Sequence, residues 1–372
     1  TMLPADEGDA IWVEWGTTER HRMIIDMGRS GRATRARLEA LAPEDRHVEL
    51  VVVTHVDADH IGGVLAGLVE GAPIEGLTFG DIWFNGRAHL DGRSVSRDPS
   101  KEHLGPAQGD RLSRWLVRRT WNDGFERGPV VRTDRAPVRV LADGMRVTVI
   151  GPTTERLKGF TATWDVEMAK VEKRRAAKAT AAGVERLGRR TPPPRPTLPD
   201  CAALKGHAAR TSTPDGSLAN GSSICIVIEW GSRRVLLTGD AWGDEIASGM
   251  AAYAAQQDPP LSLPVPVDLV KVPHHGSEGN VSDGWLTSVD APCWAISTNG
   301  TKHYHPDARA ITRILRCNPS AHLVFNEPST YNGWWTEHSW RTRFGYEVSC
   351  GASNGITVRL PADSSEREVV VI

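Results

Sequence analysis

The chain opens with short apolar runs separated by polar turns, and these runs predict β-strands. Ala10–Trp15 and Met23–Ile25 are mostly apolar and flank the polar segment Gly16–Arg22, which is typical of a β-hairpin or meander. Thr34–Leu41 carries Ala and Leu at helical spacing, and Leu50–Val53 is a continuous Val-rich run. We therefore expect a helix followed by a strand that is buried on both faces.

Similar strand patterns recur through the chain, and several of them end directly before polar clusters. A further helix is predicted from Ile61 onward. The further strands are predicted at Asp81–Phe84, Val138–Leu141, Arg146–Ile150, Ser223–Trp230, Arg234–Leu237, Val267–Val272 and Trp294–Ser297. Layered proteins of helices and sheets carry functional groups on the loops after such strands.

The stretch from about residue 155 to about residue 215 differs in composition and is predicted to be an insertion. Residues 168–190 are Ala-rich and basic, and the proline-rich segment Pro192–Pro199 follows. We expect a basic helix and an extended, polyproline-like tether. The segment could be an arm that contacts phosphates or a site reached by a protease or partner. A solvated helix and linker is the favoured interpretation, because charge runs usually face water.

Length and composition are compatible with one elaborated domain over residues 1–372. The chain has 372 residues, of which 40% are hydrophobic, enough for a large core. A C-terminal extension from about residue 320 has no assignable motif and is interpreted as completing a sheet, with Trp334, Trp335 and Trp340 as core. The net charge of -2 excludes a global attraction to nucleic acid, so such binding needs a local patch.

Cysteine usage and the absence of long apolar runs predict a reduced, cytoplasmic protein. The five cysteines are widely spread and form no CxxC pair, which argues against a disulfide framework or a zinc finger. We find no apolar run of the roughly 18 residues that a membrane span requires, and the acidic start does not resemble a secretion signal.

The densest cluster of chemically active side chains follows the Leu50–Val53 run. His55, Asp57, Asp59 and His60 supply two imidazoles and two carboxylates within six residues. Neighbouring carboxylates repel each other unless a cation compensates them. The cluster therefore predicts a metal site more readily than a solvated acidic turn.

Other metal-capable residues follow later predicted strands. Asp240 follows Arg234–Leu237, the pair His274 and His275 follows Val267–Val272, and His303 and His305 follow Trp294–Ser297. Taken singly, these residues would be read as a turn cap or a surface loop. Their recurrence at strand ends instead predicts a site assembled by the fold.

The motifs that carry these residues resemble a known family. The run THVDADHIGG resembles the HxHxDH signature of the metallo-β-lactamase superfamily, with Asp57 at the second histidine position. Together with EGDA, IDMG, Asn220–Ser223, LLTGD and KVPHHGS, it is similar to the nuclease-type domain of the competence protein ComEC and its soluble relatives, from about residue 5 to 310. The resemblance implies an α+β fold, a four-layer αββα sandwich with one or two metal ions at one edge.

The resemblance also implies roles for individual residues. His55 and Asp57 would serve the first metal, Asp59 and His60 the second, and Asp240 would bridge them. One histidine of HHGS would complete the second metal: we assign His275, with His274 lining the substrate pocket, and leave the reverse open. His303 and His305 are, with Asp59 and His274, candidate catalytic residues that contact phosphate or donate a proton.

Two departures from the family pattern bear on the metal. No equivalent appears of the separate histidine that many members place between the first motif and the Gly-Asp motif. Asp57 replaces an imidazole, which makes the site harder and shifts preference from zinc toward manganese or magnesium. We expect one or two divalent ions, Zn²⁺ or Mn²⁺, with Mg²⁺ as a further option.

The implied reaction is hydrolysis of a phosphodiester, because paired cations stabilise both the attacking and the leaving oxygen. A nuclease is the first choice, with DNA preferred over RNA by resemblance. Soluble relatives resemble effectors of bacterial defence, which suggests a partner or protease that activates or restrains the enzyme. Trp83 and Phe84 could stack on bases, but strand packing is favoured.

Three alternatives remain open. The fold also hosts small-molecule hydrolases such as phosphocholine-type esterases. A flavin-linked di-iron reductase would be expected to carry glutamate where this chain has Asp57. A degenerate domain that only binds a partner is disfavoured, because unpaired buried carboxylates would be destabilising without a metal.

Overall fold

The first half of the chain forms a four-stranded sheet. The computed structural model describes residues 1–96, 108–164, 166, 191–362 and 367–372. The sheet has the order β1-β2-β3-β4, and its strands are β1 (Ile11–Trp15), β2 (His21–Ile25), β3 (His47–Val52) and β4 (Thr78–Trp83). Strands β1 and β2 form the expected antiparallel hairpin, whereas β3 pairs in parallel with both β2 and β4.

The second sheet has eight strands in the order β14-β13-β12-β10-β8-β7-β6-β5. Pairing is antiparallel from β5 to β8 and parallel from β8 to β14. Its strands are β5 (Val138–Val140), β6 (Arg146–Gly151), β7 (Cys225–Trp230), β8 (Arg233–Leu237), β10 (Leu269–Lys271), β12 (Cys293–Ile296), β13 (His322–Phe325) and β14 (Glu347–Cys350). Two short ribbons pair β9 (Val265–Pro266) with β11 (Val289–Asp290), and β15 (Ile356–Arg359) with β16 (Glu368–Val371).

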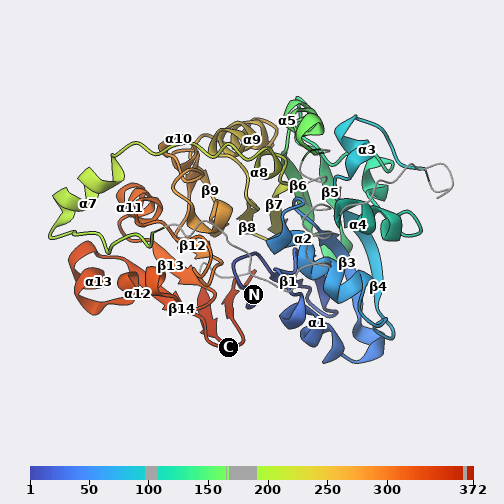
Figure 1. Cartoon of the computed structure of the whole chain (residues 1–372), viewed down its shortest axis with the longest axis horizontal. Helices are drawn as coiled ribbons and strands as arrows, with labels where there is room; N and C mark the ends of the chain where they lie inside the picture. The colour runs from blue at the N-terminus through green and yellow to red at the C-terminus, as the bar shows by residue number, and fades with distance from the viewer. Residues whose placement is uncertain (97–107, 165, 167–190, 363–366) are drawn as a thin grey trace, which may run out of the picture.

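Helices cover the outer faces of the two sheets. In Figure 1 the blue-to-green half of the chain lies on one side and the yellow-to-red half on the other. The first half carries α1 (Arg32–Glu39), α2 (Ala58–Val64) with a π-helical turn (Leu65–Val69), α3 (Arg87–Leu90), α4 (Gln108–Leu116) and α5 (Thr154–Gly159). The second half carries α7 (Cys201–Ala208), α8 (Leu218–Gly221), α9 (Gly243–Ala255), α10 (Asp283–Leu286), α11 (Ala308–Cys317), α12 (Thr330–Thr336) and α13 (His338–Phe344). Short 3₁₀ turns occur at Pro43–Asp45, Asp123–Phe125, Ala142–Gly144 and Pro273–Gly276.

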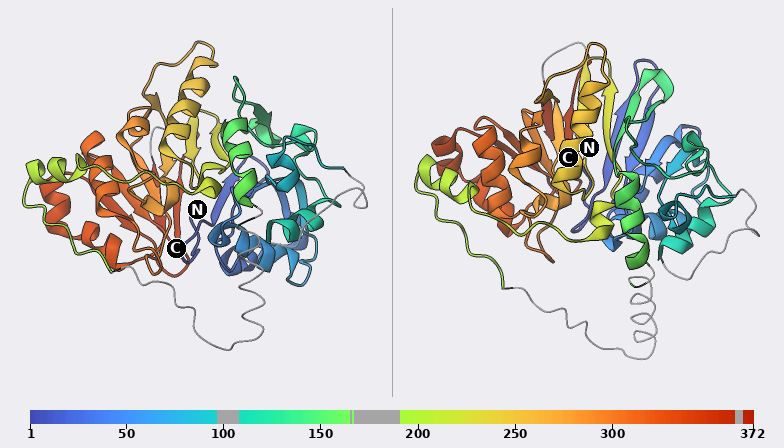
Figure 2. Two further views of the ribbon diagram at one scale, coloured as in Figure 1. Left: turned by 45° about the horizontal axis from the view of Figure 1, so that its top comes forward. Right: turned by 90° about the horizontal axis from the view of Figure 1, so that it is seen from above.

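Apolar side chains on both faces of the strands build three apolar layers, one between the two sheets and one between each sheet and its helices. In β3, Leu50 and Val52 face the second sheet and pack with residues such as Ile226, whereas Val51 faces the helices of the first half. In β7, Val227 faces the helices of the second half. Successive side chains of a strand point to opposite faces, so each buried strand feeds two layers. The expected four-layer αββα sandwich is confirmed, and Figure 2 shows it from two further directions.

The predicted insertion is only partly described. The basic segment 168–190 lies outside the described residues. The proline-rich segment has no helix or strand and is mostly exposed, as a tether would be, but it also contacts the body of the protein. Arg195 pairs with Glu337 at 2.7 Å and its guanidinium lies 4.6 Å from the Trp340 ring centroid. The Leu198 carbonyl accepts a hydrogen bond from Arg343 Nη1 at 3.1 Å. These contacts hold the segment along α13.

The C-terminal extension does more than complete a sheet. Strands β13 and β14 do extend the second sheet. Trp335 and Trp340 are buried as expected, whereas Trp334 is only partly buried and packs against the same core. The β15–β16 ribbon instead packs against the inner face of that sheet, where Ile356 contacts a small cluster with Met2, Leu269 and Val324. In the described part of the chain, no helix combines the length and hydropathy needed to cross a membrane.

Candidate metal centre

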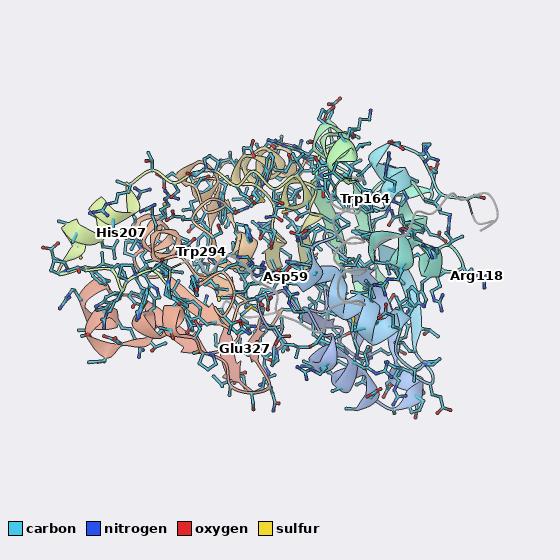
Figure 3. All side chains as sticks on the ribbon, viewed as in Figure 1. Asp59, Arg118, Trp164, His207, Trp294 and Glu327 are labelled. Atoms are coloured by element: carbon cyan, nitrogen blue, oxygen red, sulfur yellow. The ribbon has the colours of Figure 1, made fainter. Side chains whose placement is uncertain are left out.

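The His55–His60 segment lies where β3 ends and α2 begins. Helix α2 starts at Ala58 and not at Ile61 as expected, so Asp59 and His60 occupy its first turn. The reason is that Asp57 takes the N-cap position, and its carbonyl accepts the N–H groups of His60 and Ile61 at 2.9 and 3.0 Å. Its carboxylate makes no capping hydrogen bond and is 45% exposed, which leaves it available to a ligand. Figure 3 shows Asp59 near the middle of the molecule.

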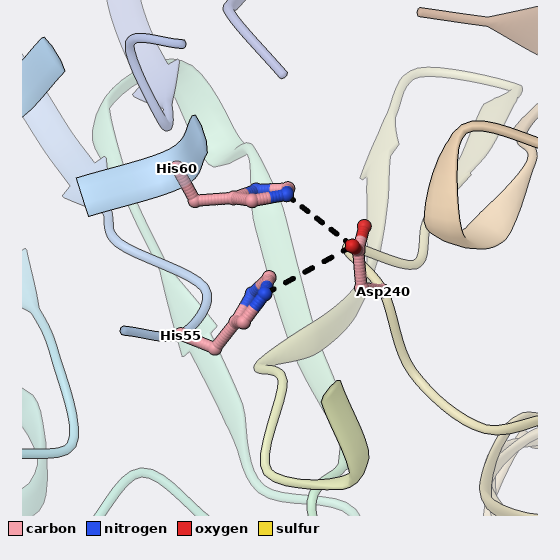
Figure 4. Close-up of side chains that lie close together, drawn as sticks. All are labelled: His55, His60 and Asp240. Carbon is pink, nitrogen blue, oxygen red and sulfur yellow. Dashed lines mark ion pairs between the residues drawn. The ribbon is translucent and has the colours of Figure 1, made fainter. Parts of the chain in front are cut away.

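Asp240 is the central residue of the site. It follows β8 after Gly239, whose φ of 52° is a left-handed conformation that glycine adopts without strain. Its Oδ2 atom lies 3.4 Å from His60 Nε2 and 3.9 Å from His55 Nε2. Figure 4 shows both histidine rings directed at the Asp240 carboxylate. All three side chains are buried. Residues from two separate strand ends thus converge on one carboxylate oxygen.

Both histidines of the HHGS motif also reach Asp240. His275 Nε2 lies 3.5 Å from Asp240 Oδ2, 3.3 Å from His60 Nε2 and 3.7 Å from Asp59 Oδ2. His274 Nε2 lies 3.9 Å from the same Asp240 oxygen, and its side chain is 24% exposed. His275 therefore lies in the cluster with Asp59 and His60, while His274 lies at its solvent side.

The Nδ1 atoms of three histidines are held by neighbouring acceptors. His60 Nδ1 contacts Asp26 Oδ2 at 2.7 Å, and His275 Nδ1 contacts the Ser297 carbonyl at 2.9 Å. His55 Nδ1 contacts Thr54 Oγ1 at 3.0 Å, and the Thr54 hydroxyl itself donates to Asp26. An Nδ1–H donated in this way leaves the Nε2 lone pair free, which is how proteins orient metal-binding imidazoles.

The spacing and chemistry of these donors fit a divalent ion. Tetrahedral ligands at about 2.0–2.2 Å from zinc are about 3.3–3.6 Å apart. The distances among His60, His275 and Asp240 lie between 3.3 and 3.5 Å. In addition, His55 Nε2 and Asp240 Oδ1 are buried without a hydrogen-bond partner among the described residues, and such atoms are costly unless a ligand satisfies them.

The charged groups of the site shift one another's pKa values. Burial opposes the imidazolium form of His275, but the carboxylates of Asp240 and Asp9 raise its pKa to about 9. Partial burial and the neighbouring Asp59 carboxylate raise the pKa of Asp57 to about 6. Burial also disfavours the Asp240 carboxylate, yet His275 and His60 hold its pKa well below its usual range. Without a cation, protons on the histidines must balance these carboxylates.

Three buried residues that sequence reasoning did not assign to the site support it. Lys271 forms an ion pair with Asp9, and both side chains are 1% exposed. Lys271 Nζ also donates to the Gly239 carbonyl at 3.1 Å, and Asp9 Oδ1 lies 3.5 Å from His275 Nδ1. Asp26 positions His60. All three residues occur within motifs that carried the resemblance, but the motifs gave no role for them.

The remaining candidates line a cleft beside His274. His305 is 6% exposed, and its ring centroid lies 5.5 Å from that of His274 and 6.0 Å from that of His303. Burial lowers the pKa of His305, and burial together with Lys302 lowers that of His303 to about 4. The cleft has a volume of about 1370 Å³. Its charged lining residues are Asp215, Glu278, Lys302 and Asp307.

The proposed base-stacking role of Trp83 and Phe84 is wrong. The two side chains are 1% and 0% exposed, so neither can meet a base. Trp83 Nε1 donates to Asp81 Oδ2 at 3.0 Å, and Asn85 exchanges two hydrogen bonds with the Val130 backbone. This segment is part of the sandwich core, as the favoured interpretation, strand packing, expected.

Comparison with known proteins agrees with this geometry. Residues 3–283 match the Metallo-beta-lactamase superfamily. The chain belongs to the metallo-β-lactamase superfamily, which includes hydrolases and nucleases and whose fold typically binds divalent metal ions.

More specific likenesses are distant. ComE operon protein 3 of Bacillus subtilis (strain 168) is 24% identical over 113 residues, which are 30% of this chain and 13% of that protein's length. Among solved structures, the metallo-beta-lactamase fold protein YhfI from Bacillus subtilis is 10% identical with a TM-score of 0.39, covering 95% of both chains. A mutant of the CmlA beta-hydroxylase is 12% identical with a TM-score of 0.37, covering all of this chain and 54% of that one.

Proposed function

We propose that this protein is a metal-dependent phosphodiester hydrolase and that its substrate is DNA. The observation that supports this proposal is the convergence of imidazole Nε2 atoms and carboxylates on Asp240 Oδ2 at the edge of the sandwich. His55, Asp57, Asp59, His60, Asp240 and His275 would hold the metal. Divalent ions bound in such a site supply a nucleophile at neutral pH and offset the charge of the attacked phosphate.

The residues beside the cluster would bind and orient the phosphate. Because His303 and His305 have lowered pKa values, both are neutral at pH 7 and suit hydrogen-bond donation to phosphate oxygens better than proton transfer. Lys302 adds a positive charge to the same loop. The preference for DNA rests on the motifs shared with the nuclease-type domain of ComEC.

A small-molecule phosphodiesterase is the second candidate, and the charge of the cleft favours it. Asp215, Glu278 and Asp307 outnumber Lys302 in the lining. A nucleic-acid backbone is bound through several Lys or Arg contacts to phosphates, and the described lining offers one. A polymeric substrate would need cations from other segments, whereas one phosphodiester group would not.

The biological setting belongs to the same proposal. A cytoplasmic effector of a defence module, with an activating or restraining partner or a protease, is supported by the sequence resemblance alone. Removing residues 168–199 and comparing partner binding and activity with the full chain tests this part.

A comparison of four substrates tests the proposed function. Supercoiled plasmid, linear DNA, RNA and bis(p-nitrophenyl) phosphate are incubated with the purified protein and Mn²⁺, Zn²⁺ or Mg²⁺. We expect metal-dependent cleavage of DNA that is lost in Asp59→Ala and retained in His338→Ala, a control histidine exposed on α13. Cleavage of the small diester with no effect on any nucleic acid would favour the second candidate.

A further inference from the structure

Four histidines place their Nε2 atoms within 3.9 Å of Asp240 Oδ2. His60 and His275 lie 3.4 and 3.5 Å from the oxygen, and His55 and His274 both lie 3.9 Å from it. A carboxylate oxygen shared by two ions needs two ligand sets around it, and four imidazoles are enough to supply both.

The nearer pair forms one complete set. His60 Nε2 and His275 Nε2 are 3.3 Å apart, and His275 Nε2 is 3.7 Å from Asp59 Oδ2. With Asp240, these residues supply two imidazoles and two carboxylates. That number satisfies a tetrahedral ion, so the second metal has no need of His274.

His274 is anchored in the same way as the other three imidazoles. Its Nδ1 lies 2.8 Å from Asn280 Oδ1 and 3.5 Å from Asp215 Oδ2. Asp215 Oδ2 is fixed by the amide groups of Asn220 and Asn280 at 2.7 and 2.9 Å. A ligating histidine commonly engages a carboxylate or amide through its other nitrogen. The anchor therefore presents Nε2 of His274 to the cluster.

The backbone explains how adjacent histidines reach one carboxylate. His274 and His275 have φ values of 47° and 56°, both in the left-handed region. Residues other than glycine carry strain of about 1–3 kcal/mol each at such angles, and such strain occurs at functional sites. Here it brings both ring nitrogens to within 3.9 Å of Asp240 Oδ2.

We propose that His274 is a ligand of the first metal, together with His55, Asp57 and Asp240, and replaces the separate histidine that this chain lacks. Each ion then receives two imidazoles and two carboxylates, with Asp240 shared. The inference rests on the metal site of the proposed function and adds a ligand to it. It also revises the assignment of His274 to the substrate pocket alone.

The two sites differ in fit. In the first set, His55 Nε2 lies 3.8 Å from Asp57 Oδ2 and 3.9 Å from Asp240 Oδ2. These separations exceed the roughly 3.3–3.6 Å of tetrahedral ligands at normal bond lengths, and Asp57 is 45% exposed. The first ion therefore binds with lower affinity than the second, and its ligands must move by a few tenths of an ångström to bind it.

Metal stoichiometry tests the inference without reference to activity. Metal-free protein is titrated with Mn²⁺ by calorimetry, bound metal is counted by mass spectrometry, and electron paramagnetic resonance reports whether two Mn²⁺ ions are magnetically coupled. We expect two ions and a coupled signal for the wild type. His274→Ala should bind one ion at the wild-type tight affinity and lose the coupled signal.

Three further variants sharpen the test. Asp215→Asn, which alters the anchor, should weaken the second binding event by about 10–100-fold and leave the tight one unchanged. His305→Ala, a buried neighbour of His274, should keep both ions. His274→Gln, which preserves side-chain bulk, replaces His274→Ala if the latter loses its thermal transition.

The outcomes separate the inference from the proposed function. Two ions at wild-type affinities in both His274 variants would overturn the inference and leave the proposed function intact. A wild type that binds one ion would overturn it as well. A wild type that binds no ion and cleaves nothing would overturn both.

Discussion

Asp26 is the residue on which the orientation of His60 depends, and its replacement by asparagine is a sharp perturbation. The Asp26 carboxylate accepts three hydrogen bonds, from Thr54 N at 2.8 Å, Thr54 Oγ1 at 2.6 Å and His60 Nδ1 at 2.7 Å. In Asp26→Asn, one oxygen still accepts the Thr54 N–H. The new amide group faces two donors and can accept from neither of them.

The magnitude follows from those contacts. His60 would shift its proton from Nδ1 to Nε2 to accept from the amide, and this removes the lone pair that faces Asp240. Loss of such an outer partner costs about 10–100-fold in metal affinity. The hydrogen bond from the Thr54 hydroxyl is then the one that is lost outright. Because a hydrogen bond to a charged group contributes about 1.5–3 kcal/mol, the metal-free protein should also lose about that much unfolding free energy.

Calorimetric titration with Zn²⁺ and urea denaturation of the metal-free protein measure the two effects. Glu49→Gln is the matched control, because Glu49 also contacts a histidine Nδ1, that of His21 at 2.9 Å. This pair lies on β2 and β3 several residues before Asp26 and His55, outside the site. The control should leave metal affinity unchanged. Equal affinity of Asp26→Asn and the wild type would refute the orientation argument.

Three further predictions follow from buried groups. Lys271→Met leaves the buried Asp9 carboxylate without its lysine partner and should lower the unfolding free energy by about 3–5 kcal/mol in urea denaturation; adding Asp9→Asn should recover part of that loss, and no recovery would contradict the pairing. The raised pKa of His275, about 9, means that its contribution to the stability of the metal-free protein is fully present below its unfolded pKa of about 6.5 and is lost as pH rises through 9. Metal competes with that proton, so metal affinity should rise over the same range, and a flat affinity profile from pH 6.5 to 9 would refute the linkage. Trp83→Ala should cost about 3–5 kcal/mol of unfolding free energy without changing the KM for DNA, whereas a higher KM in a fully folded variant would revive base stacking.

The sequence predicted those parts of the fold that depend on local pattern. The Val-rich run before His55 becomes β3, a strand buried on both faces, because its apolar residues feed the layers on both sides. The start of α2 was misplaced by three residues, since nothing in the pattern marks Asp57 as the N-cap. The β15–β16 ribbon was missed because its place against Met2 and Leu269 depends on contacts distant in sequence.

The candidate site also has parts that the sequence predicted and parts that it did not. Strand ends indicated Asp240 and the HHGS pair, but the left-handed backbone at His274 and His275 could not be predicted, because residues other than glycine rarely adopt it. Asp9 and Lys271 meet only through the fold. Their pairing compensates two buried charges, which hydrophobic periodicity does not record.

A comparison of plasmid cleavage by the wild type and by His60→Ala tests whether the protein is a metal-dependent DNA hydrolase. His60 is fully buried and contacts Asp26, Asp240 and His275, so its loss removes a ligand from the better-formed site. We expect nicking or linearisation by the wild type that depends on added Mn²⁺ or Zn²⁺ and stops with chelator. Activity should be at least 100-fold lower in the variant, which corresponds to about 2.7 kcal/mol of transition-state stabilisation. Equal cleavage by both proteins, or cleavage that persists in excess chelator, would contradict this expectation.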